Sequence, residues 1–176
     1  MDNRPPLLNW RLRLIWLRSL LVLAITLALE LPASTLHAVD ASGEALEVAR
    51  ANAATLGAEV TWLEQDGLQA AAQGAPWDLI VSNPPYVNPA ERETLAPEVR
   101  DHEPAQGLFA PEGDEHYWLR TLAQGAPGWL QTGGLMLVEL GHGQGPLALD
   151  LGQQVDPHAR VAQDLAGIPR VLVLGA

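Results

Sequence analysis

Residues 78–86 read DLIVSNPPY, an apolar run that ends in an asparagine, two prolines and a tyrosine. The apolar part is typical of a buried strand, and the prolines mark its end. Proline fixes its own φ and restricts the preceding residue to extended backbone, so Asn83 and Pro84 are both held in one geometry. Their side-chain and backbone oxygens can then form two fixed acceptors for a planar NH₂ group, with the Tyr86 ring on its face. The alternative is a strand-ending turn without chemistry.

Strand-like runs alternate with helical patterns on both sides of this stretch. Strands are expected at 35–39, 58–63, 77–81, 135–140 and 170–174, and helices at 20–31, 44–56, 89–95, 114–129 and 146–153. Residues 100–113 are expected to form a loop, and Gly133-Gly134 a turn. This alternation indicates an α/β fold with a mostly parallel, doubly wound sheet and helices on both faces.

Three polar residues stand where successive strands of this sheet are expected to end. They are Asp40, Asp66 and Asn83, and ligands of such sheets bind at the carboxyl ends of the strands. A carboxylate at Asp40 can accept hydrogen bonds from both ribose hydroxyls, and Asp66 can accept one from an adenine amino group. Taken alone, each acid is better explained without a ligand, Asp40 as a solvated strand end and Asp66 as part of an Asp-Gly turn. Together they suggest a nucleoside lying across the strand ends.

The composition argues against several classes of function. The formal net charge of the 176 residues is −11, and all ten basic residues are Arg. Such a charge repels phosphate backbones, so a nucleic-acid partner has no electrostatic footprint. The absence of cysteine excludes disulfides, thiolate metal sites and a cysteine nucleophile, and the five histidines show no metal-ligand spacing. No metal is therefore predicted.

From Val22 onward the chain resembles the catalytic domain of the release-factor glutamine methyltransferases (HemK/PrmC type), which are S-adenosylmethionine-dependent enzymes of the Rossmann-like methyltransferase class. The matching segments are LHAVDASGEALEVARANAATLG (36–57), DLIVSNPPYV (78–87), LAPEVRDHEP (95–104), GGLMLVELGHGQG (133–145) and DLAGIPRVLVLG (164–175). The NPPY run is shared with enzymes that methylate adenine amino groups in DNA. The segment 98–104 is the one that resembles the protein-glutamine branch.

The resemblance implies a role for each site residue. Asp40 would hold the cofactor ribose, Asp66 and Gly67 would border its adenine, and Asn83 would touch both cofactor and substrate. The catalytic set would be Asn83, Pro84 and Tyr86, and the substrate would be bound by Asn83, Pro84, Pro85, Tyr86 and Glu103. Glu103 is equally well explained as part of a solvated acidic loop.

The implied substrate is the glutamine of a Gly-Gly-Gln loop in a class I peptide-chain release factor, methylated in the cytoplasm without a nucleic-acid or membrane partner. Two alternatives stay open at this point. One is a DNA or RNA amino-methyltransferase, and the other is a catalytically dead Rossmann-like remnant.

The resemblance breaks at the N-terminus. The family's Asp-Leu-Gly-x-Gly-x-Gly turn should lie over residues 15–21, but the chain has IWLRSLL there, with neither Gly nor Asp. Those glycines let the backbone approach the methionine end of the cofactor. We therefore expect residues 1–21 to be an atypical segment, from a displaced reading frame or a truncated gene product, and 22–176 to be the methyltransferase domain. The basic, then apolar, pattern of the first 31 residues also fits a secretory signal.

Overall fold

A single seven-stranded sheet organises the computed structural model, which describes residues 13–17, 21–102 and 104–175. The strand order is β3-β2-β1-β4-β5-β7-β6. β1 to β5 pair in parallel, whereas β7 runs antiparallel to both of its neighbours. The strands are β1 (Arg13–Leu17), β2 (Thr35–Asp40), β3 (Thr61–Glu64), β4 (Trp77–Ser82), β5 (Leu130–Glu139), β6 (Arg160–Gln163) and β7 (Pro169–Gly175). The predicted mostly parallel sheet is thus confirmed.

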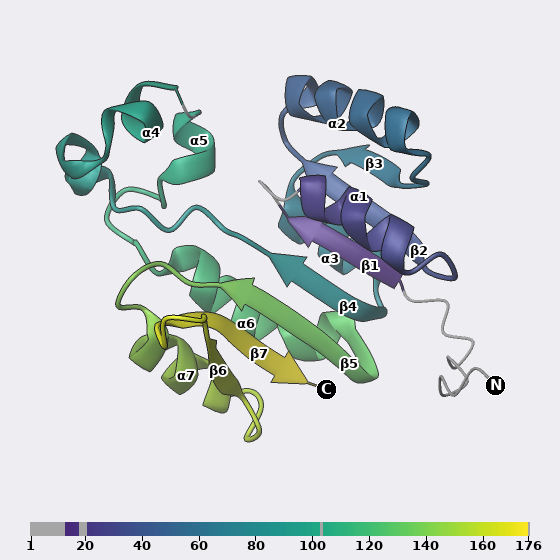
Figure 1. Ribbon diagram of the computed structural model, residues 1–176. Helices are drawn as coiled ribbons and strands as arrows, with labels where there is room; N and C mark the ends of the chain where they lie inside the picture. Colours follow the sequence, from purple (N-terminus) through teal and green to yellow (C-terminus); the bar gives the residue numbers. More distant parts are fainter. Residues whose placement is uncertain (1–12, 18–20, 103, 176) are drawn as a thin grey trace.

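Helices cover both faces of the sheet (Figure 1). α1 (Leu21–Glu30) and α2 (Gly43–Leu56) lie on one face beside β2 and β3, while α3 (Gly67–Gly74), α6 (Tyr117–Trp129) and α7 (Gly145–Gln153) form the opposite layer. Three short helices stand apart, beyond the carboxyl end of β4: the 3-10 helix η1 (Pro89–Thr94), α4 (Pro97–His102) and α5 (Ala105–Leu108). The segment between β4 and α6 therefore overhangs the edge where ligands bind in such folds.

The period of two along β2 decides which core each of its side chains joins. Leu36 and Ala38 pack against Ala24 of α1 in a small buried cluster. Val39 points the other way, into a larger cluster that includes Ile80 and contains buried residues of α3, α6, α7 and the central strands. The sheet is therefore buried on both faces, as parallel sheets are.

Most predicted elements are found, with their ends set by identifiable caps. The Ser42 hydroxyl accepts a hydrogen bond from the Ala45 N–H at the start of α2, and Gly57 ends this helix with a φ of 72°. The closing strand and the helices at 114–129 and 146–153 are also present, within a few residues of the expected ends.

Two expectations are wrong. Residues 100–113 are not all loop, because Pro97 starts the short helix α4 and a further turn of helix, α5, begins just after Pro104. The pair Gly133-Gly134 does not form the predicted turn before a strand, because both residues lie inside β5. Gly133 has a φ of 79° inside β5, and the pairing of β4 with β5 shifts register before Leu135, so the positive φ is used in a bulge.

Besides α4 and α5, three elements have no counterpart in the sequence-based prediction: β1, α3 and β6. β1 lies within the segment 1–21 and occupies the centre of the sheet, between β2 and β4. Across the described ranges, no helix has the length and apolar character needed to cross a membrane.

Candidate functional site

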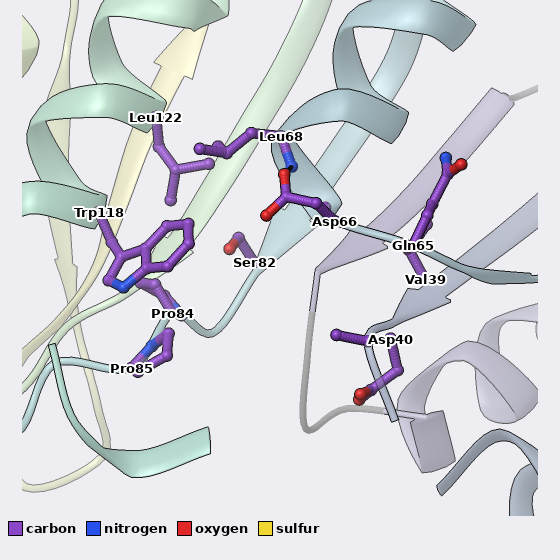
Figure 2. A pocket seen from close by; sticks show the side chains of 12 residues that line it. Val39, Asp40, Gln65, Asp66, Leu68, Ser82, Pro84, Pro85, Trp118 and Leu122 are labelled. Carbon is purple, nitrogen blue, oxygen red and sulfur yellow. Dashed lines mark hydrogen bonds between the residues drawn. The ribbon is translucent and has the colours of Figure 1, made fainter. Parts of the chain in front are cut away.

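The carboxyl ends of β2, β3 and β4 meet around one cavity (Figure 2). Its walls come from three strand ends, from the start of α3 and from α6. The lining residues are Val39, Asp40, Ala41, Gln65, Asp66, Gly67, Leu68, Ser82, Pro84, Pro85, Trp118 and Leu122. The convergence of Asp40, Asp66 and the NPPY run expected from the sequence is therefore present, because parallel neighbouring strands end at the same edge.

Asp40 is the last residue of β2 and is only 7% exposed. Its Oδ1 accepts a hydrogen bond of 2.8 Å from the Ser42 backbone N–H, which fixes the carboxylate at the edge of the sheet. The other oxygen has no hydrogen bond to a described residue. A buried carboxylate requires donors, so this oxygen is suited to accept hydrogen bonds from a ligand's hydroxyl groups.

Asp66 has a structural role that the sequence analysis did not assign. Its Oδ1 accepts hydrogen bonds from the backbone N–H groups of Leu68 and Gln69, at 2.9 and 3.1 Å, and so caps α3. The Asp-Gly pair is thus a helix start and not only a turn. The other carboxylate oxygen, Oδ2, faces the cavity (Figure 2). It can accept a hydrogen bond from a ligand.

Among the described residues, two carboxylates and no cationic side chain line this cavity. Such a lining disfavours phosphates and favours a ligand that carries donors or positive charge. A nucleoside offers hydroxyl and amino donors, and a sulfonium carries positive charge. The described residues therefore fit the nucleoside portion of S-adenosylmethionine, the part whose chemistry Asp40 and Asp66 can recognise.

The NPPY run leaves β4 in the direction of this cavity. Pro84 and Pro85 are buried and line it. Asn83 lies between the lining residues Ser82 and Pro84 and is half-buried, but it is not itself among the residues that line the cavity. No hydrogen bond joins the Asn83 amide to the part of the chain that the structure describes. The Asn83 Oδ1 atom therefore accepts no hydrogen bond from a described residue.

Tyr86 turns to a different cavity, of about 440 Å³, next to the carboxyl end of β5. Its ring packs directly on Gly141, where an added Cβ would come within 2.7 Å of the Tyr86 Cδ2 atom. Gly141 opens the run GHGQG, which forms a turn leaving the sheet, as the sequence predicts. The structure thus separates Tyr86 from the cavity that Pro84 and Pro85 line.

A third cavity, of about 410 Å³, lies on the other side of Asp40. It is bordered by the start of α1, by one face of α2, and by Pro104 and Gly107 in the overhanging segment. Here α1 begins with Leu21 and Val22, where the family's glycine-rich turn would end. Residues 18–20 and Glu103 lie outside the described residues, so the expected role of Glu103 stays a prediction.

Trp118 and Leu122 are lining residues that the sequence analysis missed. Both lie on α6, four residues apart and so on one face of the helix. The available signal was this i, i+4 apolar pair near the start of a helix predicted at 114–129. It was not enough, because nothing in the local sequence says that α6 faces the ends of β3 and β4. In the described ranges, no group of three or more His, Asp or Glu side chains could hold a metal ion.

Comparisons with known proteins agree with this geometry. The family model "Methyltransferase small domain" matches residues 21–102. The release factor glutamine methyltransferase of Chlorobaculum tepidum is 46% identical over 123 residues, which are 67% of this chain and 41% of that protein. The ribosomal protein uL3 glutamine methyltransferase of Bordetella pertussis is 43% identical over 121 residues, covering 68% of this chain and 40% of that protein.

Among solved structures, human methyltransferase-like protein 13 in complex with SAH has a TM-score of 0.63 and 19% identity, over 94% of this chain and 72% of that chain. This likeness shows the fold. The chain spans about half the length of the curated relatives it matches, between 41% and 55% of the first several. Over that half, the chain is similar in sequence to release factor glutamine methyltransferases, and its fold is that of the Rossmann-like methyltransferases.

Proposed function

We propose that the chain transfers a methyl group from S-adenosylmethionine to the side-chain amide nitrogen of a protein glutamine. The observation that carries this proposal is the NPPY run, which leaves β4 beside a cavity lined by the carboxylates of Asp40 and Asp66. Relatives named as glutamine methyltransferases at 36–46% identity support the same reaction.

The proposed binding mode follows the carboxylates. Asp40 would accept hydrogen bonds from the two ribose hydroxyls, while Asp66 and Gly67 would border the adenine. S-Adenosylmethionine supplies an electrophilic methyl carbon on a sulfonium. The chain's own contribution is to orient this group toward the end of β4, where Asn83 follows the buried Ser82.

Asn83 and Pro84 would prepare the substrate. An amide nitrogen is a poor nucleophile because its lone pair is delocalised into the carbonyl. The Asn83 Oδ1 and the Pro84 carbonyl would accept the two N–H hydrogens, which favours the geometry that frees this lone pair. Holding nitrogen and carbon at about 3–3.5 Å supplies several kcal/mol of the barrier. The N–C bond would form as the C–S bond breaks, so that S-adenosylhomocysteine leaves, and the amide N–H, which becomes acidic as the bond forms, would lose its proton to water. An uncharged asparagine therefore suffices.

The side chains of Tyr86 and Glu103 would then bind the protein around the glutamine. Pro85 would complete the amide pocket, and Tyr86 would close it if its ring turns from Gly141 toward the amide. The substrate we favour is the Gly-Gly-Gln loop of a class I peptide-chain release factor, which places the reaction in the cytoplasm. Ribosomal protein uL3 is a second candidate, since a relative at 43% identity is named for it.

Methyl transfer to DNA or RNA is disfavoured by charge. The net charge of −11 opposes phosphate binding, and none of the described residues that line the cavity at the strand ends is cationic. A dead remnant is the other alternative, because residues 15–21 lack the glycines expected beside the methionine end. Calorimetry with S-adenosylmethionine distinguishes this remnant from an enzyme, since only the enzyme binds.

The test of the reaction is methyl incorporation from radiolabelled S-adenosylmethionine. Purified chain is mixed in parallel with release factor, uL3 and duplex DNA, and the methylated residue is located by mass spectrometry. We expect label on a glutamine of one of the two proteins and none on DNA. Label on DNA alone, or cofactor binding without transfer to either protein, contradicts the proposal.

Asn83→Ala is the matched variant. It should lower transfer by at least about 100-fold, as removal of a positioned hydrogen-bonding group in other active sites does, with an unchanged thermal melt. Asn88→Ala is the control, because Asn88 caps η1 and lies away from the Asp40 cavity. Substantial transfer by Asn83→Ala would refute the role assigned to this residue.

A further inference from the structure

We infer that Trp118 is the residue on which the purine of the cofactor stacks, so that α6 supplies the aromatic wall of the nucleoside site. This inference rests on the proposed function and names a residue that neither the family resemblance nor the NPPY motif assigns. Its basis is the position of the Trp118 indole in the cavity at the ends of β2, β3 and β4.

Figure 2 shows the indole next to Leu122 and Pro84, with Asp66 and Ser82 facing the same space. Asp66 would bind the exocyclic amino group of an adenine in the plane of the base. An aromatic ring beside that carboxylate, from a different element, can contact the face of the base. Hydrogen bonding at the edge and stacking on the face are the two contacts by which proteins hold a purine.

Trp118 is free to make this contact. The side chain is half-buried, and no hydrogen bond joins its indole N–H to the described part of the chain. Its neighbour Tyr117 supports it edge-on, with ring centroids 5.1 Å apart and planes at 83°. In such a T-shaped pair the two rings are not stacked face to face, so at least one face of the indole is not covered by Tyr117. By contrast, Trp77 is fully buried in the larger core and donates its N–H to the Ala71 carbonyl at 2.8 Å.

The size of the cavity adds a specific consequence. Its volume is about 50 Å³, which is room for only one or two water molecules. A purine is larger than this space, so on binding it would lie partly at the mouth of the cavity or displace a lining side chain, and Trp118 has the largest partly exposed side chain of the lining. Binding should therefore change the environment of this indole, which makes the inference measurable by tryptophan fluorescence.

The experiment uses S-adenosylhomocysteine and adenosine as probes, with the full chain and three variants. Trp118→Leu keeps an apolar side chain but removes the ring, and should weaken binding about tenfold, as loss of one base–aromatic contact does. Trp118→Phe keeps a ring and should bind within about threefold of wild type. Trp62→Phe is the control, since Trp62 packs in the small cluster near α1 and should bind normally.

Fluorescence separates stacking from a structural effect. In the wild type and in Trp62→Phe, S-adenosylhomocysteine should quench the emission, whereas in Trp118→Phe the ligand should bind without that quench. Normal affinity of Trp118→Leu, or a full quench in Trp118→Phe, overturns the role of Trp118 and leaves the proposed function intact. If wild-type protein binds neither probe, the proposed function fails together with this inference.

Discussion

The two faces of the sheet are packed very differently. On the face of α3, α6 and α7, one cluster joins buried side chains from four strands and three helices, with Trp77, Ile80, Met136 and Leu172 at most 1% exposed. On the face of α1, the cluster formed by side chains that the structure describes contains only Ala24, Leu36 and Ala38 as buried members, surrounded by partly exposed side chains. The outer surface of α1 and α2 even leaves Val22 73% and Val48 63% exposed.

Because of this difference in packing, the two helix layers contribute differently to stability and to the nucleoside site. Burial scales with the area removed from water, so the α3–α6–α7 layer supplies most of the hydrophobic stabilisation. It also carries Trp118, Leu122 and the strand that ends in NPPY. Asp40 comes from β2 and borders cavities toward both layers. The nucleoside site therefore borders the large core on one side and the smaller cluster beside α1 on the other.

The largest expected effect compares one substitution in each core. Ile80→Ala, in the large cluster, should lower the free energy of unfolding by about 3–4 kcal/mol, because dense surroundings cannot collapse into the vacated space. Leu36→Ala, in the small cluster, should cost about 2 kcal/mol, since its partly exposed neighbours can move in. Urea unfolding monitored by circular dichroism measures both. Equal losses would mean that the two faces are packed alike.

How far the sequence predicts the structure follows the same division. Runs such as Leu135–Leu140 and Arg170–Leu174 predict strands correctly because their apolar character matches their burial on both sides. The short strand β1 is missed because it lies in the segment 1–21, which is expected from the sequence to be atypical, and β6 is missed because it has only four residues, RVAQ, without an apolar run. α3 is missed because its small residues show little helical period and Asp66-Gly67 is also a common turn pair.

The candidate site was predictable where strand ends fix it and unpredictable where packing does. Asp40 and Asp66 lie together as expected, because strand order in such a sheet brings their ends to one edge. That Tyr86 packs on Gly141, and that Trp118 closes the cavity, depends on how α6 and the turn after β5 approach β4. These contacts join residues far apart in the sequence, and no local pattern encodes them.

The second prediction concerns Asp40, between the two layers. Asp40→Asn should lower the affinity for S-adenosylhomocysteine about tenfold, because hydrogen bonds to a charged acceptor are stronger than those to a neutral one. Stability should change little, since an amide oxygen can still accept the Ser42 N–H. Calorimetry measures the affinity, with Glu44→Gln in the exposed first turn of α2 as the control. Unchanged binding by Asp40→Asn would remove Asp40 from the ribose site.

The third prediction addresses the exposed outer face of α2. Val48→Gln should change the free energy of unfolding by less than about 0.5 kcal/mol, because Val48 is already 63% exposed and glutamine is the better helix former. Ala49→Gln, one residue further on and 3% exposed, is the matched comparison and should be strongly destabilising, since a buried amide would replace a methyl group. A large loss in Val48→Gln would show that this face is covered in solution.

The smallest effect is expected at the turn between β6 and β7, on the edge of the well-packed region. Hydrogen bonds from the Ile168 and Ala166 N–H groups, with Arg170 nearby, hold the pKa of the Asp164 carboxyl below its usual value. A pKa lowered by folding adds stability above the unfolded-state pKa, and this stability is lost as the pH falls through the folded-state pKa. Asp164→Ala should therefore lower the melting temperature slightly at pH 7, and the difference from wild type should shrink as the pH falls below about 4.

Glu59→Ala, the substitution of an exposed acid before β3, controls for the change in net charge. Because Asp164 lies far from α1 and the nucleoside site, its substitution should leave cofactor affinity unchanged, which separates the stability of this edge from binding at the other.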